Sequence, residues 1–342
     1  MSSVFAVING TTIVERRSVI AVLGGVAVAG AFAVLAQQGL QQRRIGVFMN
    51  LAADDPEAAS RLDAFLQRME ELGWRDGHNM RIDYRWGAGN ADRHGAYAAE
   101  LISSGSEVIV AAGGPIVKML QQATQTVPIV FVQAIDPVGA GIVNNLSRPG
   151  GNTTGFASID YRMGEKRLQL LKELVPQLTR IAVIRDPMTS AGTGQLTAIQ
   201  AVGPMFGVDV RAIDALDLDE VERAVAAFAA ESNGGLLVTT STFATVHRER
   251  LSSIAAQHRL PAIYPSPLFV ASGGLVSYGS AVARQYELAA GYVDRILKGT
   301  KPGDLPVQQP TQYELAINLT TAHSLGIEVS RRFLARADHI FE

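Results

Sequence analysis

Short apolar runs rich in β-branched residues alternate with amphipathic helical periods along most of the chain. Between Pro56 and Leu72, apolar side chains recur every three or four residues, which predicts a helix with one buried face. Pro56 is placed to start this helix and Gly73 to end it. The other apolar runs have the length and composition of strands. The predicted strands are 44–50, 80–86, 108–112, 128–133, 154–158, 180–185, 208–213, 235–240, 261–264 and 275–278.

The order of these elements predicts an α/β fold with two similar lobes. Strands and helices alternate, the pattern breaks near residues 158–164, and the alternation then resumes, as in parallel βαβ units. We expect each lobe to be a doubly wound parallel sheet, with the lobes joined by a multi-strand hinge. The later predicted elements are a helix at 281–298, a turn-rich segment at 298–306, a strand at 313–318 and a short helix at 320–325. The expected N-terminal lobe is 43–158 plus about 279–306, and the C-terminal lobe is 159–278 plus about 307–337.

The first 36 residues have the parts of a secretory signal. The uncharged apolar run 19–35 follows Arg16 and Arg17, and small residues precede the expected cleavage point after Ala36. The paired arginines match part of the twin-arginine export signal. A membrane anchor is the alternative, because the run lies at the lower edge of spanning length, although its glycines and alanines make it weakly hydrophobic. The sequence therefore predicts export.

Composition argues against several classes of function. A net charge of −2 and the absence of Lys/Arg clusters offer no surface for nucleic acid. The absence of cysteine excludes disulfides, thiolate nucleophiles and cysteine-ligated metals. No two of the six histidines have the spacing of a helical metal pair, and no Gly-x-Ser-x-Gly elbow is present. We expect no metal, no cofactor and no catalysis, with a doubly wound α/β enzyme as an alternative.

The glycines after the fourth predicted strand come close to a dinucleotide-binding fingerprint. Asn144 stands where the third glycine is required, and Gly139 comes three residues after Asp136 instead of directly after the strand. Asp136 and Pro137 fit better as the N-cap and first residue of a short helix. The sequence leaves open whether Asp136 caps this helix, contacts a ligand or does both.

Polar and glycine residues follow the carboxyl ends of several predicted strands. In open α/β sheets ligands bind outside these ends, where helix N-termini offer free N–H groups to an anion. Gly113-Gly114-Pro115 is such a strand-to-helix turn, and Arg185-Asp186 either holds a zwitterion or forms an internal pair. The candidate ligand-binding residues are Asn50, Gly113, Gly114, Pro115, Gln133, Asp136, Arg185, Asp186, Thr240, Ser241, Tyr264, Ser266 and Tyr278.

Sequence pieces spread over residues 43–337 carry a family resemblance. They are RIGVFMN (44–50), ELGW (71–74), NMRIDYRW (79–86), VPIVFV (127–132), DPVG (136–139), SRPGGN (147–152) with Gly155, KGTKP (298–302), LP (305–306) and NL (318–319). Together they resemble the substrate-binding proteins of ABC transporters, in the family that includes tryptophan- and aromatic-amino-acid-binding relatives. The leader is also similar to those of soluble periplasmic members, and it has no lipobox cysteine.

The resemblance implies a type I periplasmic binding fold that closes two lobes on a small ligand without catalysis. It implies a periplasmic location and ABC permease subunits as partners, and we expect a monomer. The expected ligand is an amino acid or a related small carboxylate. Its carboxylate would be held by N–H groups at Gly113–Pro115 or Thr240-Ser241, and its amino group by Asp136 or Asp186. The alternative is the ligand-sensing domain of a signalling system.

Overall fold

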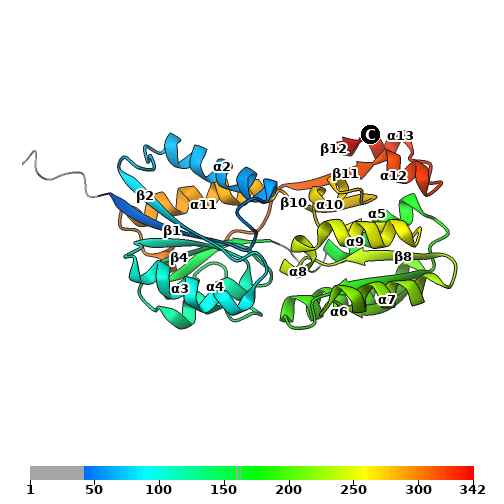
Figure 1. Cartoon of the computed structure of the whole chain (residues 1–342), viewed down its shortest axis with the longest axis horizontal. Helices are drawn as coiled ribbons and strands as arrows, with labels where there is room; N and C mark the ends of the chain where they lie inside the picture. The colour runs from blue at the N-terminus through cyan, green and yellow to red at the C-terminus, as the bar shows by residue number, and fades with distance from the viewer. Residues whose placement is uncertain (1–41, 159–160, 162) are drawn as a thin grey trace, which may run out of the picture. The chain divides into compact units, whose positions relative to one another are not determined.

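The computed structural model describes residues 42–158, 161 and 163–342, which are organised around two β-sheets (Figure 1). The first sheet is parallel throughout, in the order β2-β1-β3-β4-β5. Its inner strands are covered on both faces, which explains why they are continuous apolar runs instead of alternating ones. The strands are β1 (Arg43–Met49), β2 (Met80–Trp86), β3 (Val108–Ala112), β4 (Ile129–Ala134) and β5 (Thr153–Ala157).

Two pairs of helices cover this sheet. One face packs against α2 (Pro56–Glu71) and α11 (Val282–Leu297), and the other against α3 (His94–Ser103) and α4 (Gly114–Ala123). The Asp55 carboxylate caps α2 by accepting the Glu57 N–H at 3.0 Å, so the predicted helix start is confirmed. Because α11 comes from far along the chain, the polypeptide returns to the first sheet after building most of the second.

The second sheet repeats and extends the first. Its order is β12-β11-β10-β9-β8-β6-β7, and the segment β7-β6-β8-β9-β10 is parallel with the same winding as the first sheet. The added strand β11 runs antiparallel to β10. The strands are β6 (Arg180–Arg185), β7 (Asp209–Asp214), β8 (Gly234–Val238), β9 (Ala262–Tyr264), β10 (Val276–Ser280), β11 (Tyr313–Asn318) and β12 (His339–Phe341).

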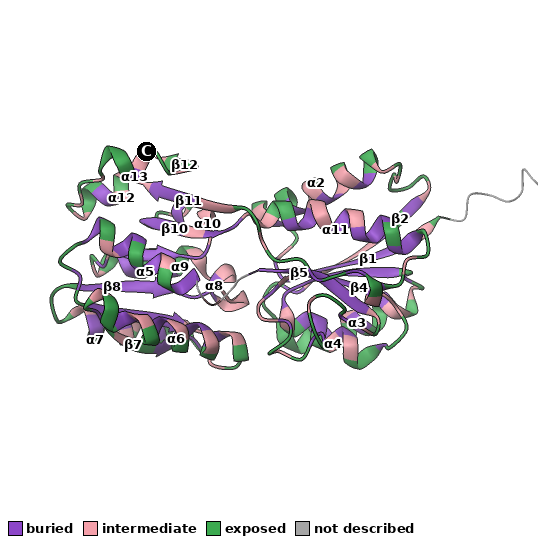
Figure 2. Ribbon diagram, turned by 180° about the vertical axis from the view of Figure 1, so that it is seen from behind, coloured by how far each residue is buried: buried purple, intermediate pink, exposed green. Residues whose placement is uncertain are grey.

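Helices also cover both faces of the second sheet, and their buried stripes point toward the strands (Figure 2). One face packs against α5 (Met163–Leu174), α6 (Ser190–Val202), α12 (Leu319–Ser324) and α13 (Arg331–Leu334). The other packs against α7 (Leu218–Ala229), α9 (Arg248–Gln257) and α10 (Pro267–Ala271). The short helices are α8 (Thr242–Val246), η1 (Ala91–Arg93), η2 (Gly203–Phe206) and η3 (Pro302–Asp304). The structure therefore confirms the predicted pair of parallel-sheet α/β lobes.

The chain links the two sheets by way of β5, β10 and the segment after η3. In that last segment, Gln308 bonds the edge of β5, accepting from the Ala157 N–H at 2.9 Å and donating to the Gly155 carbonyl at 3.0 Å. A side-chain contact also connects the lobes, because the Arg248 guanidinium bonds both Asp55 carboxylate oxygens at 2.8 and 3.2 Å. The predicted short helix after Asp136 is wrong, since residues 137–141 form turns. Strand β12 was not predicted.

Candidate functional site

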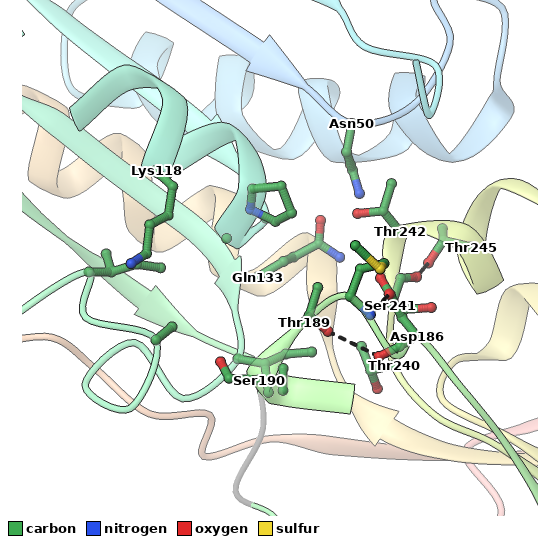
Figure 3. A pocket seen from close by; sticks show the side chains of 18 residues that line it. Asn50, Lys118, Gln133, Asp186, Thr189, Ser190, Thr240, Ser241, Thr242 and Thr245 are labelled. Carbon is green, nitrogen blue, oxygen red and sulfur yellow. Dashed lines mark hydrogen bonds between the residues drawn. The ribbon is translucent and has the colours of Figure 1, made fainter. Parts of the chain in front are cut away.

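A cavity of about 360 Å³ lies at the carboxyl ends of strands from both sheets (Figure 3). One wall follows β1, β3 and β4 of the first sheet, and the other follows β6 and β8 of the second. Ligands of open α/β sheets bind at these ends. The lining residues are Asn50, Gly113, Gly114, Pro115, Lys118, Gln133, Ile135, Ala140, Ile142, Asp186, Met188, Thr189, Ser190, Ala191, Thr240, Ser241, Thr242 and Thr245.

Most of the residues proposed from the sequence line this cavity. They are Asn50, Gly113, Gly114, Pro115, Gln133, Asp186, Thr240 and Ser241. The α4 N-terminus enters the first wall through Gly113, whose φ of 87° puts its backbone in the region that favours glycine. The α6 N-terminus enters the second wall, where the Thr189 hydroxyl caps it by accepting the Gly192 N–H at 3.1 Å. Each lobe thus turns a helix N-terminus toward the same space.

Asp136 is not among the described residues that line the cavity. Its Oδ1 accepts the Gly139 N–H at 2.9 Å, the bond expected of a cap, although the following residues turn instead of forming a helix. Its Oδ2 accepts the Tyr161 hydroxyl at 2.9 Å. Burial, together with this bond, raises the pKa of Tyr161 to about 12. Both carboxylate oxygens of Asp136 are therefore engaged by the protein itself.

Four other candidates also lie outside the cavity lining. Arg185 pairs with Asp214 at 2.8 Å instead of with its neighbour Asp186. The other three are aromatic or capping residues: Tyr264 is fully buried and stacks on Phe269, Ser266 is the N-cap position of α10, and Tyr278 stacks on Tyr313. Tyr264 ends β9 as expected, whereas Tyr278 lies in the middle of β10 instead of at its end, and both rings pack within the second lobe.

Lys118 lines the cavity and was missed by the sequence reasoning. It lies one turn into α4, between the buried residues Val117 and Leu120, so a lone lysine on a helix that begins at a strand end was the available signal. Among the residues that the structure describes, no carboxylate lies within 4.0 Å of its ammonium. Asp186, on the opposite wall, likewise has no ion-pair partner in the described part of the chain; its Oδ1 accepts the Met188 N–H at 2.9 Å.

Gln133 is held in place by its surroundings. Its φ of 58° is unusual for a residue other than glycine, and its backbone N–H is bonded to Gln285 Oε1 at 3.0 Å. Its side-chain oxygen Oε1 accepts from the buried Arg61 guanidinium at 2.8 Å. The Gln133 amide lies between the two walls in Figure 3, with its nitrogen toward the second.

The second wall has a comparable support. Gln195 bonds both backbone groups of Thr240, accepting from the N–H at 3.0 Å and donating to the carbonyl at 3.1 Å. Arg167, which is fully buried, donates to the Thr240 hydroxyl at 3.3 Å and to the Tyr278 carbonyl at 2.8 Å. Gly192 allows α6 to approach this wall, because a side chain there would meet the Asp186 carbonyl oxygen at 1.8 Å.

A second cavity of about 400 Å³ adjoins the first and shares Asn50, Pro115, Asp186 and Thr242 with it. Its other lining includes the rings of His94, Phe243 and His247. Burial lowers the pKa of both histidines below the usual 6.5, so both rings are neutral at neutral pH. No group of three or more His, Asp or Glu side chains suited to a metal occurs in the described residues. The lining of the second cavity is more apolar than that of the first.

Known proteins resemble this chain over most of its length. A "Tyrosine-binding protein" of Clostridioides difficile is 25% identical over 288 residues, which are 84% of this chain and 82% of that protein. A crystal structure of a conserved domain protein from Vibrio cholerae is 27% identical with a TM-score of 0.81, covering 88% of this chain and 100% of the other. A Streptococcus pneumonia structure in complex with L-Trp has the same TM-score and coverage at 22% identity, which shows the shared fold.

The family of this chain is shown by its match to the sequence model of a protein family. The sequence model for the family described as ABC transporter substrate binding protein matches residues 13–341. That range contains both sheets and every residue of the cavity lining. The chain therefore belongs to the ABC transporter substrate-binding protein family.

Proposed function

We propose that this protein binds an α-amino acid with an aromatic side chain in the cavity between the two walls and delivers it to an ABC permease. The observation that carries the ligand class is the pair of opposite charges without ion partners in the described residues, Lys118 on the first wall and Asp186 on the second. A zwitterionic ligand has an anionic group that can pair with Lys118 and a cationic group that can pair with Asp186. Its carboxylate would lie toward Lys118 and the α4 N-terminus, and its ammonium toward Asp186.

The adjoining cavity supports an aromatic side chain on the ligand. Phe243, His94 and His247 line it, and it shares Asp186 with the first cavity. Aromatic rings gain free energy from both burial and ring–ring contact. The relative named for tyrosine binding agrees with this class. Neutral histidine rings also offer hydrogen-bond groups that a hydroxyl or an indole N–H can use.

The transport role rests on membership of the family and on the leader of the chain. The leader lies outside the described residues, so export to the periplasm and cleavage after Ala36 stay predictions from sequence. In the described residues, no helix has both the length and the apolar character needed to cross a membrane. The permease subunits, the monomeric state and the absence of catalysis are likewise part of this proposal.

The test is calorimetric titration of the full-length chain with L-tyrosine and L-tryptophan, followed by analogues that lack one charge. Tyramine lacks the carboxylate and 4-hydroxyphenylpropionate lacks the ammonium, so both should bind far more weakly than tyrosine. Ligand at 100 times its Kd should stabilise the protein by about 2.7 kcal/mol, because only the folded state binds it. Equal binding of tyrosine and both analogues would contradict the zwitterion assignment. If the protein binds sugars but no amino acid, the proposed ligand class is wrong and only the proposed transport role remains.

A further inference from the structure

Two fully buried arginines lie behind the cavity, one in each lobe. Arg61 lies on α2 with 1% of its surface exposed, and Arg167 lies on α5 with the same exposure. A buried guanidinium requires hydrogen-bond partners, because desolvation of a charge is costly. In both cases one partner is a side chain that lines the cavity. Each arginine therefore bonds a side chain that lines the cavity, although neither arginine lines the cavity itself.

Arg61 determines which end of the Gln133 amide faces the cavity. Its Nη1 donates to Gln133 Oε1 at 2.8 Å, while its Nε is paired with Glu57 at 2.8 Å. A guanidinium has donors only, so the amide oxygen must turn toward it. The amide nitrogen, with its two hydrogens, is then directed to the cavity, as Figure 3 shows. Because Arg61 is already paired with Glu57, its contribution is one of orientation and not of net charge.

Arg167 acts in the same way on Thr240 and adds a charge. Its Nη2 donates to the Thr240 hydroxyl oxygen at 3.3 Å, which leaves the hydroxyl hydrogen free to donate elsewhere. No carboxylate of the described residues pairs with Arg167. Burial lowers its pKa to about 10, so it stays charged at neutral pH. An uncompensated buried cation favours an anion in the neighbouring space.

We propose that Arg61 and Arg167 are positioning residues that make the cavity selective for a ligand carboxylate. Each bonds the oxygen of one lining side chain, which directs the hydrogens of that side chain toward the ligand. Asp186 is then the acidic acceptor in the lining, and it is left for the ammonium group. This inference deepens the proposed function and rests on it.

The experiment compares the affinity of the full-length chain for L-tyrosine with its affinity for L-tyrosinamide, which keeps the ammonium and ring but has no carboxylate. The wild-type protein should prefer tyrosine. Arg167→Met and Arg61→Met should each reduce the ratio of the two affinities by about tenfold, the effect of one hydrogen bond to a charged group. A purely structural loss would weaken both probes alike and leave the ratio unchanged.

Arg180→Met is the matched control. Arg180 is also buried in the second lobe, but it lies over the Phe228 ring at 4.5 Å and donates to the Ser232 carbonyl, away from the cavity. Its replacement should lower stability without changing the ratio. A change in the ratio as large as that of Arg167→Met would overturn the inference.

Two further variants decide the question if the arginine variants do not fold. Gln133→Glu keeps the contact with Arg61 but puts a carboxylate oxygen where the amide nitrogen was, so tyrosine should lose far more affinity than tyrosinamide. Thr240→Val removes the donor hydroxyl at nearly constant shape and should lower the ratio. An unchanged ratio in both would overturn the inference while leaving amino-acid binding intact. Failure of the wild-type protein to bind any amino acid would instead overturn the proposed function, and this inference with it.

Discussion

The first wall and the turn after β6, which is one part of the second wall, are held in place by different kinds of contact. In the first, Gln133 is bonded to Arg61 and Gln285, which are 72 and 152 residues away, and Gln285 also bonds Ser280 at the end of β10. In the second, the turn after β6 is held by bonds between near neighbours, from Met188 to Asp186 and from Gly192 to Thr189. The first wall therefore depends on the tertiary structure of the lobe, whereas the turn depends mainly on its own sequence.

The contacts of Gln133 extend to the connection between the two lobes. Ser280 lies where the chain leaves the second sheet for α11, so the bonds from Gln133 reach one of the links between the lobes. A ligand that contacts Gln133 would act on a residue connected to the hinge, while one that contacts the turn after β6 would act locally. Variants at Gln133 and its partners should therefore differ from variants of the turn after β6 in how stability and affinity change together.

Asp186→Asn should have the largest effect on affinity and almost none on folding. Asparagine keeps the side-chain oxygen that accepts the Met188 N–H, so the turn should remain, but it lacks the charge expected to meet the ligand ammonium. Loss of this charge should weaken L-tyrosine binding by about 2–3 kcal/mol, measured by calorimetry. Affinity within twofold of the wild type would show that the ammonium lies elsewhere. Asp217→Asn, at the remote N-cap of α7, is the control and should leave affinity unchanged.

Gln285→Leu should destabilise the first lobe and weaken binding together. The variant leaves the Gln133 N–H without its partner in a site where Gln285 is only 4% exposed. An unpaired buried donor costs about 1–3 kcal/mol of the free energy of unfolding, which urea denaturation measures. The positive φ of Gln133 is then less constrained, so affinity for L-tyrosine should fall as well. Destabilisation with unchanged affinity would contradict the role given to this long-range contact.

Thr189→Ala tests the locally held turn after β6 and should have a smaller effect. The change removes the cap of α6 and should lower the free energy of unfolding by about 1 kcal/mol. Because the Asp186 turn has its own bond to Met188, affinity for L-tyrosine should change less than it does in Gln285→Leu. If Thr189→Ala loses the greater share of affinity, the contrast between the first wall and the turn after β6 does not hold.

The smallest expected effect is a loss of stability on mild acidification through His94. Burial lowers the pKa of His94 in the folded state, whereas the unfolded chain has the ordinary value of 6.5. The unfolded state therefore binds the proton more readily, and stability should be full above pH 6.5 and fall as the pH drops below it. His94→Gln should reduce this dependence in thermal unfolding between pH 8 and 5. His247→Gln, at a less buried ring, should reduce it less; equal effects would count against burial as the cause.

Much of the cavity was predictable because strand ends are readable in sequence. The apolar runs ending before Asn50, Gly113 and Asp186 place these residues at the carboxyl edge of a parallel sheet, and the sheet brings such edges together. The same reasoning placed Tyr264 and Tyr278 at strand ends, but their side chains pack inside the second lobe. The hydrophobic pattern along the chain identifies where a strand ends, but it does not determine the direction of the side chains at that end.

The two α/β lobes and most of the backbone that borders the cavity follow from local hydrophobic period and turn residues, so the amino-acid sequence is enough to predict them. Which of the charged and polar candidates line the cavity, and which are engaged by contacts inside the protein, depends on tertiary packing. Lys118 lines the cavity from α4, and both carboxylate oxygens of Asp136 are engaged by Gly139 and Tyr161. Arg61 and Arg167 bond lining residues that are distant from them in sequence, so no local sequence pattern predicts these contacts.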